Sequence, residues 1–136
     1  WRVNTQTLGI VLAKLTIPKT TQPKTNFSEA VFTVGTSSDA VAIKQCLVAT
    51  NGEVAKGKTT INGISYAVTE LGDAGAGNFY TTKSYRTLRN DQCYVIEYTV
   101  HSTNIGAYSP DQGISEFNAA SVVKDLEGIV QSFKFL

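Results

Sequence analysis

Short apolar runs bounded by turn residues indicate strands in the first part of the chain. Residues Thr7–Ile17 read "TLGIVLAKLTI", which is apolar and rich in β-branched residues, and the run ends at Pro18. Asn26–Val34 alternates in part between apolar and polar positions and ends at Gly35. Such runs, separated by a polar segment that contains proline, predict two β-strands.

A change to helical spacing follows the second run. Segment 37–39 reads Ser-Ser-Asp, which supplies helix-capping side chains and an acid for the first turn. The apolar residues after it recur three and four positions apart, which predicts a short helix with one buried face. These residues are Ala42, Ile43, Cys46 and Leu47.

Turn residues divide the middle of the chain into two predicted hairpins. Asn62-Gly63 lies between Thr59–Ile61 and Ile64–Leu71, and both residues suit the positive φ of a type I′ turn. Segment 90–92, Asn-Asp-Gln, lies between Phe79–Arg89 and Cys93–Thr103. The last of these strands is apolar on both faces, so we expect it at the centre of a sheet that is covered on both sides.

The C-terminal segment has the pattern of an amphipathic helix. Apolar residues recur at helical spacing in a stripe made of Val122, Leu126, Ile129 and Phe133, which Val123 and Val130 widen, and this predicts a helix over about Glu116–Ser132. The whole pattern predicts one α+β domain over residues 1–136. Its fold would be a single antiparallel β-sheet on which a long C-terminal helix and a short helix pack.

Composition excludes several classes of function. The 136 residues carry a net charge of +1, and the basic residues are scattered, with Lys14, Lys19 and Lys24 the nearest to a cluster, so we expect no nucleic-acid partner. No apolar run approaches the ~20 residues of a membrane-spanning helix, so we expect no span within this chain. Because the chain begins at Trp1 rather than at methionine, we expect that an upstream signal or anchor has been removed.

The two cysteines, Cys46 and Cys93, leave two interpretations open. They are either buried free thiols or the partners of one disulfide. Sparse charge and abundant Ser, Thr and Asn favour the disulfide and an oxidising compartment. A bridge over this separation would stabilise the fold by about 4 kcal/mol in the chain-entropy model. With a single histidine, His101, a zinc site lacks ligands, and we expect no metal or other cofactor.

A glycine-rich stretch, residues 72–78, invites comparison with phosphate-binding loops. Those loops lead into a helix, whereas the residues that follow here predict a strand, so the stretch is interpreted as a turn between strands. A weaker hypothesis is that it lines a binding surface together with the loop 104–113. The candidate binding residues in these two loops are Asp73, Gly75, Gly77, Asn78, Tyr108 and Asp111.

Two residues of the apolar strand are candidates for chemistry. Glu97 is a lone carboxylate in "YVIEYTV", and a half-buried carboxylate needs a partner. We predict an ion pair with Arg86, or with Lys83, on the neighbouring strand. A general acid or base is the functional alternative. A hydrolase would use Glu97 or His101, but four residues of strand separate them by roughly 13 Å.

The C-terminal half, "SYRTLRNDQCYVIEYTVHSTN" with a closing "DLEGIVQSFKF", resembles the PsbP-like α+β fold. In that family a hairpin precedes a last helix that ends in a step matched here by residues 132–135, Ser-Phe-Lys-Phe. The chain from about Thr25 onward is also similar to uncharacterised bacterial secreted or lipoprotein-type domains. These resemblances imply an extracytoplasmic module that binds another protein or a cell-envelope component, with no catalytic residue to transfer.

The expected function is therefore an extracytoplasmic binding or structural module, secreted or tethered to a membrane by a removed N-terminal segment. Two alternatives stay open at this point. One is a small hydrolase that uses Glu97 or His101. The other is a subunit of a surface filament.

Overall fold

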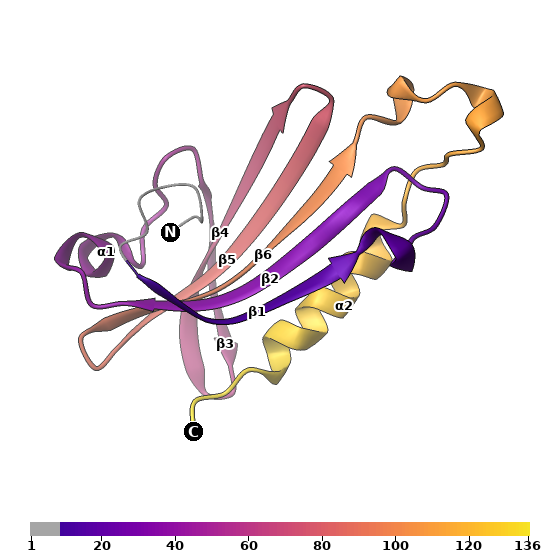
Figure 1. The fold of residues 1–136 in the computed structure, drawn as a ribbon. Helices are drawn as coiled ribbons and strands as arrows, with labels where there is room; N and C mark the ends of the chain where they lie inside the picture. Colours follow the sequence, from indigo (N-terminus) through magenta and orange to yellow (C-terminus); the bar gives the residue numbers. More distant parts are fainter. Residues whose placement is uncertain (1–8) are drawn as a thin grey trace.

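The computed structural model describes residues 9–136 and contains one six-stranded antiparallel sheet and two α-helices (Figure 1). The elements follow one another in the predicted order, two strands, a helix, four strands and a helix. The strands are β1 (Ile10–Pro18), β2 (Phe27–Ser37), β3 (Val54–Ile61), β4 (Ile64–Gly75), β5 (Asn78–Arg89) and β6 (Gln92–Thr103). The helices are α1 (Ala40–Gln45) and α2 (Ala119–Ser132). The first strand was predicted to begin at Thr7, which lies outside the described residues.

The strand order across the sheet is β1-β2-β6-β5-β4-β3. β1 pairs with β2 in one hairpin, β3 to β6 pair in succession as three more, and the sheet is completed where β2 pairs with β6. This arrangement places β6 inside the sheet, as its apolar sequence predicted. β1 and β3 are the two edge strands.

Tight turns join the strands of the three consecutive hairpins from β3 to β6. Asn62-Gly63 forms the first turn with φ values of 46° and 82°, which confirms the predicted type I′ geometry. The glycine-rich stretch is only partly a turn. β4 continues through Gly75, and the turn consists of Ala76-Gly77, with φ values of 49° and 77°. The stretch is therefore the end of a long hairpin rather than an open loop.

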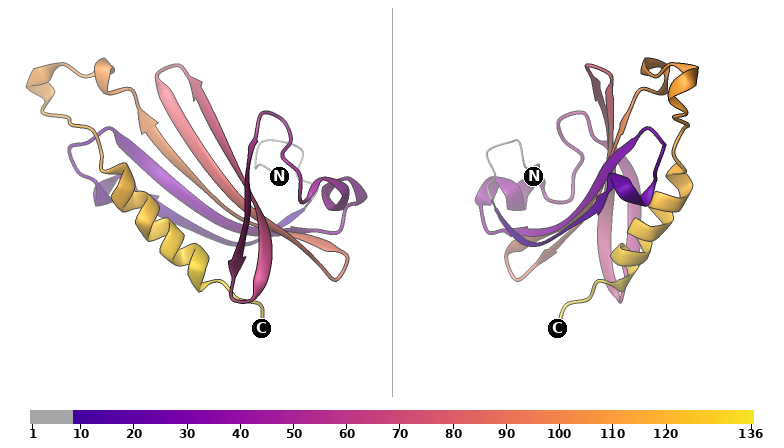
Figure 2. Two further views of the ribbon diagram at one scale, coloured as in Figure 1. Left: turned by 180° about the vertical axis from the view of Figure 1, so that it is seen from behind. Right: turned by 45° about the vertical axis from the view of Figure 1, so that its right-hand side comes forward.

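The main core lies between one face of the sheet and α2. Val122, Leu126 and Val130 of the helix are fully or almost fully buried. They pack against apolar side chains from the inner strands, which include Phe32, Val34, Ile96, Tyr98 and Val100. The views in Figures 1 and 2 show α2 running obliquely along this face.

The predicted C-terminal helix is shorter than expected, with 14 residues that begin at Ala119 rather than at Glu116. Asn118 caps it, because its side chain accepts a hydrogen bond from the Ser121 amide. Phe117, the residue before the cap, lies outside the helix, and its amide donates a hydrogen bond to the side-chain oxygen of Asn26. Phe117 also packs its ring on Phe27, with 5.4 Å between the ring centroids.

The short helix α1 lies on the opposite face of the sheet (Figure 2). Asp39 caps it by accepting hydrogen bonds from the amides of Val41 and Ala42. Cys46, which follows the helix, forms a disulfide with Cys93 of β6, with 5.7 Å between the Cα atoms. The bridge agrees with the prediction, and together with Val95 it forms a small second core under α1.

Candidate functional site

The face of the sheet opposite α2 carries most of the residues singled out from the sequence. The ladders align Asp73, Tyr80, His101 and Glu29 in one row across four strands. Four residues further along each strand, a second row on the same face holds Thr69, Ser84, Glu97 and Thr33. A third row between them contains Leu71, Thr82, Thr99 and Val31. We call this side of the sheet, on which the three rows lie, the polar face.

Glu97 is buried on the polar face, but its partner is not the predicted one. The hydroxyl of Ser84, directly opposite on β5, donates a hydrogen bond to its carboxylate. Glu97 forms no salt bridge with any residue between 9 and 136. The hydroxyl of Thr69, on the other side of Ser84, is also buried and has no hydrogen-bond partner among the described residues.

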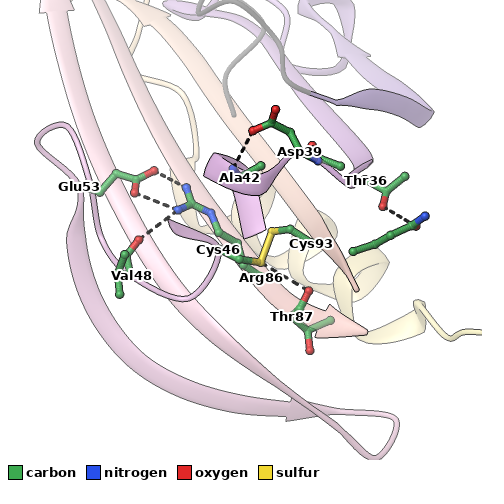
Figure 3. Close-up of a disulfide and its surroundings, with 11 residues drawn as sticks. Thr36, Asp39, Ala42, Cys46, Val48, Glu53, Arg86, Thr87 and Cys93 are labelled. Carbon is green, nitrogen blue, oxygen red and sulfur yellow. Dashed lines mark hydrogen bonds and ion pairs between the residues drawn. A yellow bond between two sulfur atoms is a disulfide. The ribbon is translucent and has the colours of Figure 1, made fainter. Parts of the chain in front are cut away.

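The predicted ion pair of Glu97 with Arg86 is wrong, because Arg86 binds Glu53 (Figure 3). Both guanidinium NH groups donate to the Glu53 carboxylate, and the two side chains are only 7% and 5% exposed. Glu53 comes from the segment between α1 and β3, which passes over the polar face beside the disulfide (Figure 3). The backbone carbonyl of Val48, in the same segment, also accepts from Arg86.

The alternative partner, Lys83, points to the other face and pairs with Glu127 of α2, 2.8 Å away. The hydroxyls of Tyr85 and Tyr98 donate to the same carboxylate at 2.6–2.7 Å. Burial opposes ionisation of Glu127, but these three donors and the Lys83 charge together lower its pKa below the ordinary value. Burial and the bonds to Glu127 raise the pKa of both tyrosines. The cluster attaches the middle of α2 to the sheet.

His101 lies on the polar face at the end of β6 that is distant from the disulfide. Its Nε2 is 2.8 Å from the side-chain oxygen of Asn78. Its ring stacks on Tyr80, with 4.4 Å between the ring centroids. Because His101 and Glu97 are four positions apart on one strand, roughly 13 Å separates their backbones. The two candidate residues of a hydrolase do not converge on one reacting group.

The predicted binding loops come together only in part. Asn78 and Thr103 are opposite each other, and the Thr103 hydroxyl is 2.8 Å from that of Tyr108. Gly75, opposite Asn78, and Gly77 belong to the same hairpin end, and Asp73 lies within β4, two positions before Gly75. Asp111 is in a separate 3-10 turn, Pro110–Gln112, where a hydrogen bond from Ser109 lowers its pKa. Within residues 9–136, no group of three acidic, histidine or cysteine side chains could hold a metal ion.

The outer edge of β1 is a second candidate surface, which the sequence analysis did not identify as functional. Within residues 9–136, β1 pairs only with β2, so its other edge faces outward. Its apolar side chains are exposed: Ile10 by 64%, Val11 by 56%, Leu12 by 54% and Leu15 by 46%. The sequence could have indicated this surface, because a long apolar run with a single charge, Lys14, is unusual for an exposed edge strand.

The opposite edge strand, β3, is built differently. It carries Lys56 and Lys58, and Gly57 between them has a φ of 83°. The pairing with β4 shifts register between Ala55 and Lys58. Charges and bulges of this kind protect an edge strand from pairing with another chain. By this comparison, β1 is the less protected edge of the sheet.

Comparison of the chain with protein-family models, with curated proteins and with solved structures finds no match. The PsbP-like resemblance of the C-terminal half therefore remains a prediction. In the described part of the chain, neither helix has the length and apolar character needed to cross a membrane.

Proposed function

We propose that this protein is an extracytoplasmic binding module that recognises another protein or a cell-envelope component through β1. The observation that supports this most directly is the exposure of Ile10, Val11, Leu12 and Leu15 on one edge strand. Large apolar side chains that stay together at a surface are typical of interaction sites. The contrast with the lysine-bearing edge β3 shows that the apolar edge is not a general property of this sheet.

The disulfide supports the extracytoplasmic part of the proposal. Disulfides persist in oxidising compartments and are rare in a reducing cytosol. Cys46 and Cys93 are also the main contacts between α1 and the central strand β6, together with Val95. The bridge is thus part of the fold rather than an accessory on the surface.

Site-specific photo-crosslinking in the producing cells tests this function. A photoreactive side chain is placed at Leu15 on β1 and, in a matched variant, at Lys58 on β3, since both positions are exposed edge positions. We expect one recurrent adduct from position 15, and none from position 58. The adduct should disappear when excess unlabelled wild-type chain competes. Adducts that are equal at both positions, or absent from position 15, would contradict the proposal.

A further inference from the structure

The backbone of β1 offers more than apolar side chains. In an edge strand, alternate residues direct both N–H and C=O away from the sheet, and these groups can pair with another strand. The pairing of β1 with β2 shifts register between Val11 and Ala13 and then runs without interruption from Ala13 to Pro18. Pro18 lacks an N–H, so it limits the edge at that end. Segment 13–17 is therefore a regular stretch of sheet edge with one charged side chain, Lys14.

Side chains along segment 13–17 alternate between the two faces. Leu15 and Ile17 are opposite Phe32 and Ala30 of β2, on the side of α2, and Ile17 packs against the main core. Lys14 and Thr16 are opposite Thr33 and Val31, on the polar face. A strand added beside β1 would therefore extend the apolar layer with every second residue, and it would place the residues between them beside Lys14 and Thr16.

The charge around β1 indicates what the added strand carries. Lys14, Lys19 and Lys24 are all exposed, and the acidic residue that comes first in the sequence, Glu29, lies opposite Pro18 at the end of β1. Opposite charges directly across an antiparallel pair are stabilising, and like charges are destabilising. A second copy of this chain, paired antiparallel about Leu15, would place Lys14 opposite Thr16 and would leave the lysines without an acidic partner. An acidic segment of another protein would compensate them.

We propose that an extended segment of a partner protein, with an acidic side chain between apolar residues, binds beside β1 as an added antiparallel strand. This inference rests on the proposed function and specifies how that function is performed. Main-chain hydrogen bonds along segment 13–17 provide the attachment, and Lys14 selects an acidic residue. The apolar residues of the partner cover Leu15 and extend the layer between sheet and α2.

A random peptide library displayed on phage supplies the probe. Peptides are selected on the full chain, synthesised, and their binding is measured by titration with NMR detection of the amide resonances. We expect enrichment of alternating sequences with at least one Asp or Glu, and resonance changes concentrated at residues 13–17. If the peptides bind elsewhere, or if no peptide is selected, both the binding surface and the strand mode are contradicted.

N-methylation of the peptide backbone separates strand addition from side-chain docking. Only every second amide of an added strand points toward β1. Methylating two of those amides should weaken binding by about tenfold or more, whereas methylating the intervening amides should have a small effect. Equal effects of the two modifications would refute strand addition and leave the β1 surface as a binding site. The proposed function and its mode can therefore fail separately.

Charge reversal tests the selection by Lys14. Lys14→Glu should weaken binding of the acidic peptides by about fivefold, and Lys58→Glu on β3 should leave it unchanged. Unchanged binding to Lys14→Glu would contradict the acidic specificity. Sedimentation of the chain without peptide gives the remaining outcome. A dimer that Leu15→Glu dissociates and Lys58→Glu does not would assign the edge to a second copy and overturn the proposal.

Discussion

At the scale of single residues, the polar face shows how a one-residue difference in register changes partners. Interpreting residues 90–92 as the turn would place Tyr85 opposite Glu97 and would turn Arg86 to the other face of the sheet. The structure uses only Asn90 and Asp91, with φ values of 50° and 56°, so Arg89 pairs with Gln92. Ser84 then lies opposite Glu97, and Arg86 lies opposite Val95. Two adjacent residues that tolerate positive φ were a sufficient signal for the shorter turn.

Glu97→Gln should leave the free energy of unfolding unchanged or raise it by about 1 kcal/mol at neutral pH. The substitution removes a buried charge that has no cationic partner among the described residues, and the amide oxygen of Gln can still accept from Ser84. Urea unfolding of the variant measures this. Ser84→Ala is the matched control and should destabilise the fold by about 1–3 kcal/mol, because it leaves the carboxylate without this donor. A large loss for Glu97→Gln would mean that its charge is needed.

Arg86→Met should destabilise the fold by about 3–5 kcal/mol, because it leaves the buried Glu53 carboxylate without this guanidinium. Glu53→Gln should also be destabilising, since it leaves a buried cation. The double variant should lose clearly less than the sum of the two single losses. Chemical denaturation of the wild type, the two single variants and the double variant gives the free energies of unfolding for this double-mutant cycle. Additive losses would show that the two side chains are not coupled.

At the scale of elements, capping side chains and contacts with the rest of the fold set where each helix begins. The apolar stripe of α2 was visible in the sequence, and its buried residues Val122, Leu126 and Val130 agree with it. Its start was predicted three residues too early, because Phe117 follows the helical pattern but packs on Phe27 instead. That contact joins positions far apart in the sequence, so periodicity within the helix could not reveal it.

Gly128→Ala should stabilise the protein by up to about 1 kcal/mol. In the structure Gly128 is exposed within α2, and a Cβ atom added there would meet no atom within 4 Å. Thermal and urea unfolding should both show the gain. A loss of stability would indicate a close contact at this position.

The attachment of α2 should weaken in acid. Because the pKa of Glu127 is lower in the folded protein than its ordinary value of 4.5, its contribution is complete above that value. The contribution is lost as the pH falls through the folded-state pKa. Urea unfolding between neutral pH and about pH 3 measures the slope.

Two variants identify the origin of that acid sensitivity. Glu127→Gln should flatten the pH dependence, because it removes the titrating group. Tyr85→Phe should reduce the dependence without abolishing it, since Lys83 and Tyr98 still donate to the carboxylate. An unchanged slope in Glu127→Gln would assign the acid sensitivity to other groups.

At the scale of the whole molecule, one sheet separates two unequal layers. The main core lies between the sheet and α2, and a small core of Cys46, Cys93 and Val95 lies on the other side. The disulfide and the Arg86–Glu53 pair both attach the segment that follows α1 to the polar face (Figure 3). This side of the molecule depends on a covalent bond and a charge pair rather than on a large apolar layer.

Replacing both cysteines by alanine should lower the free energy of unfolding by about 4 kcal/mol, because the bridge closes a loop with a sequence separation of 47. Denaturant unfolding of the variant and of the oxidised wild type gives the difference. The wild type unfolded with reductant should resemble the variant. Alkylation of two cysteines in unreduced, denatured protein would show that the bridge is not formed, and it would remove the main support for an extracytoplasmic location.

The order of elements, the two-residue turns, the amphipathic stripe of α2 and the candidate cysteine pair were determined by the sequence itself, because each depends on residues near one another in the chain or on a single pair of thiols. The tertiary structure decided which charges meet. Glu53 reaches Arg86 only because the segment after α1 crosses the polar face. Glu127 reaches Lys83 only because α2 lies on the opposite face of the sheet. It also decided that β1 is an edge, since β2 pairs with β6 at sequence separations of 56 or more. Local periodicity contains no information about these distant pairings, and the proposed binding surface depends on them.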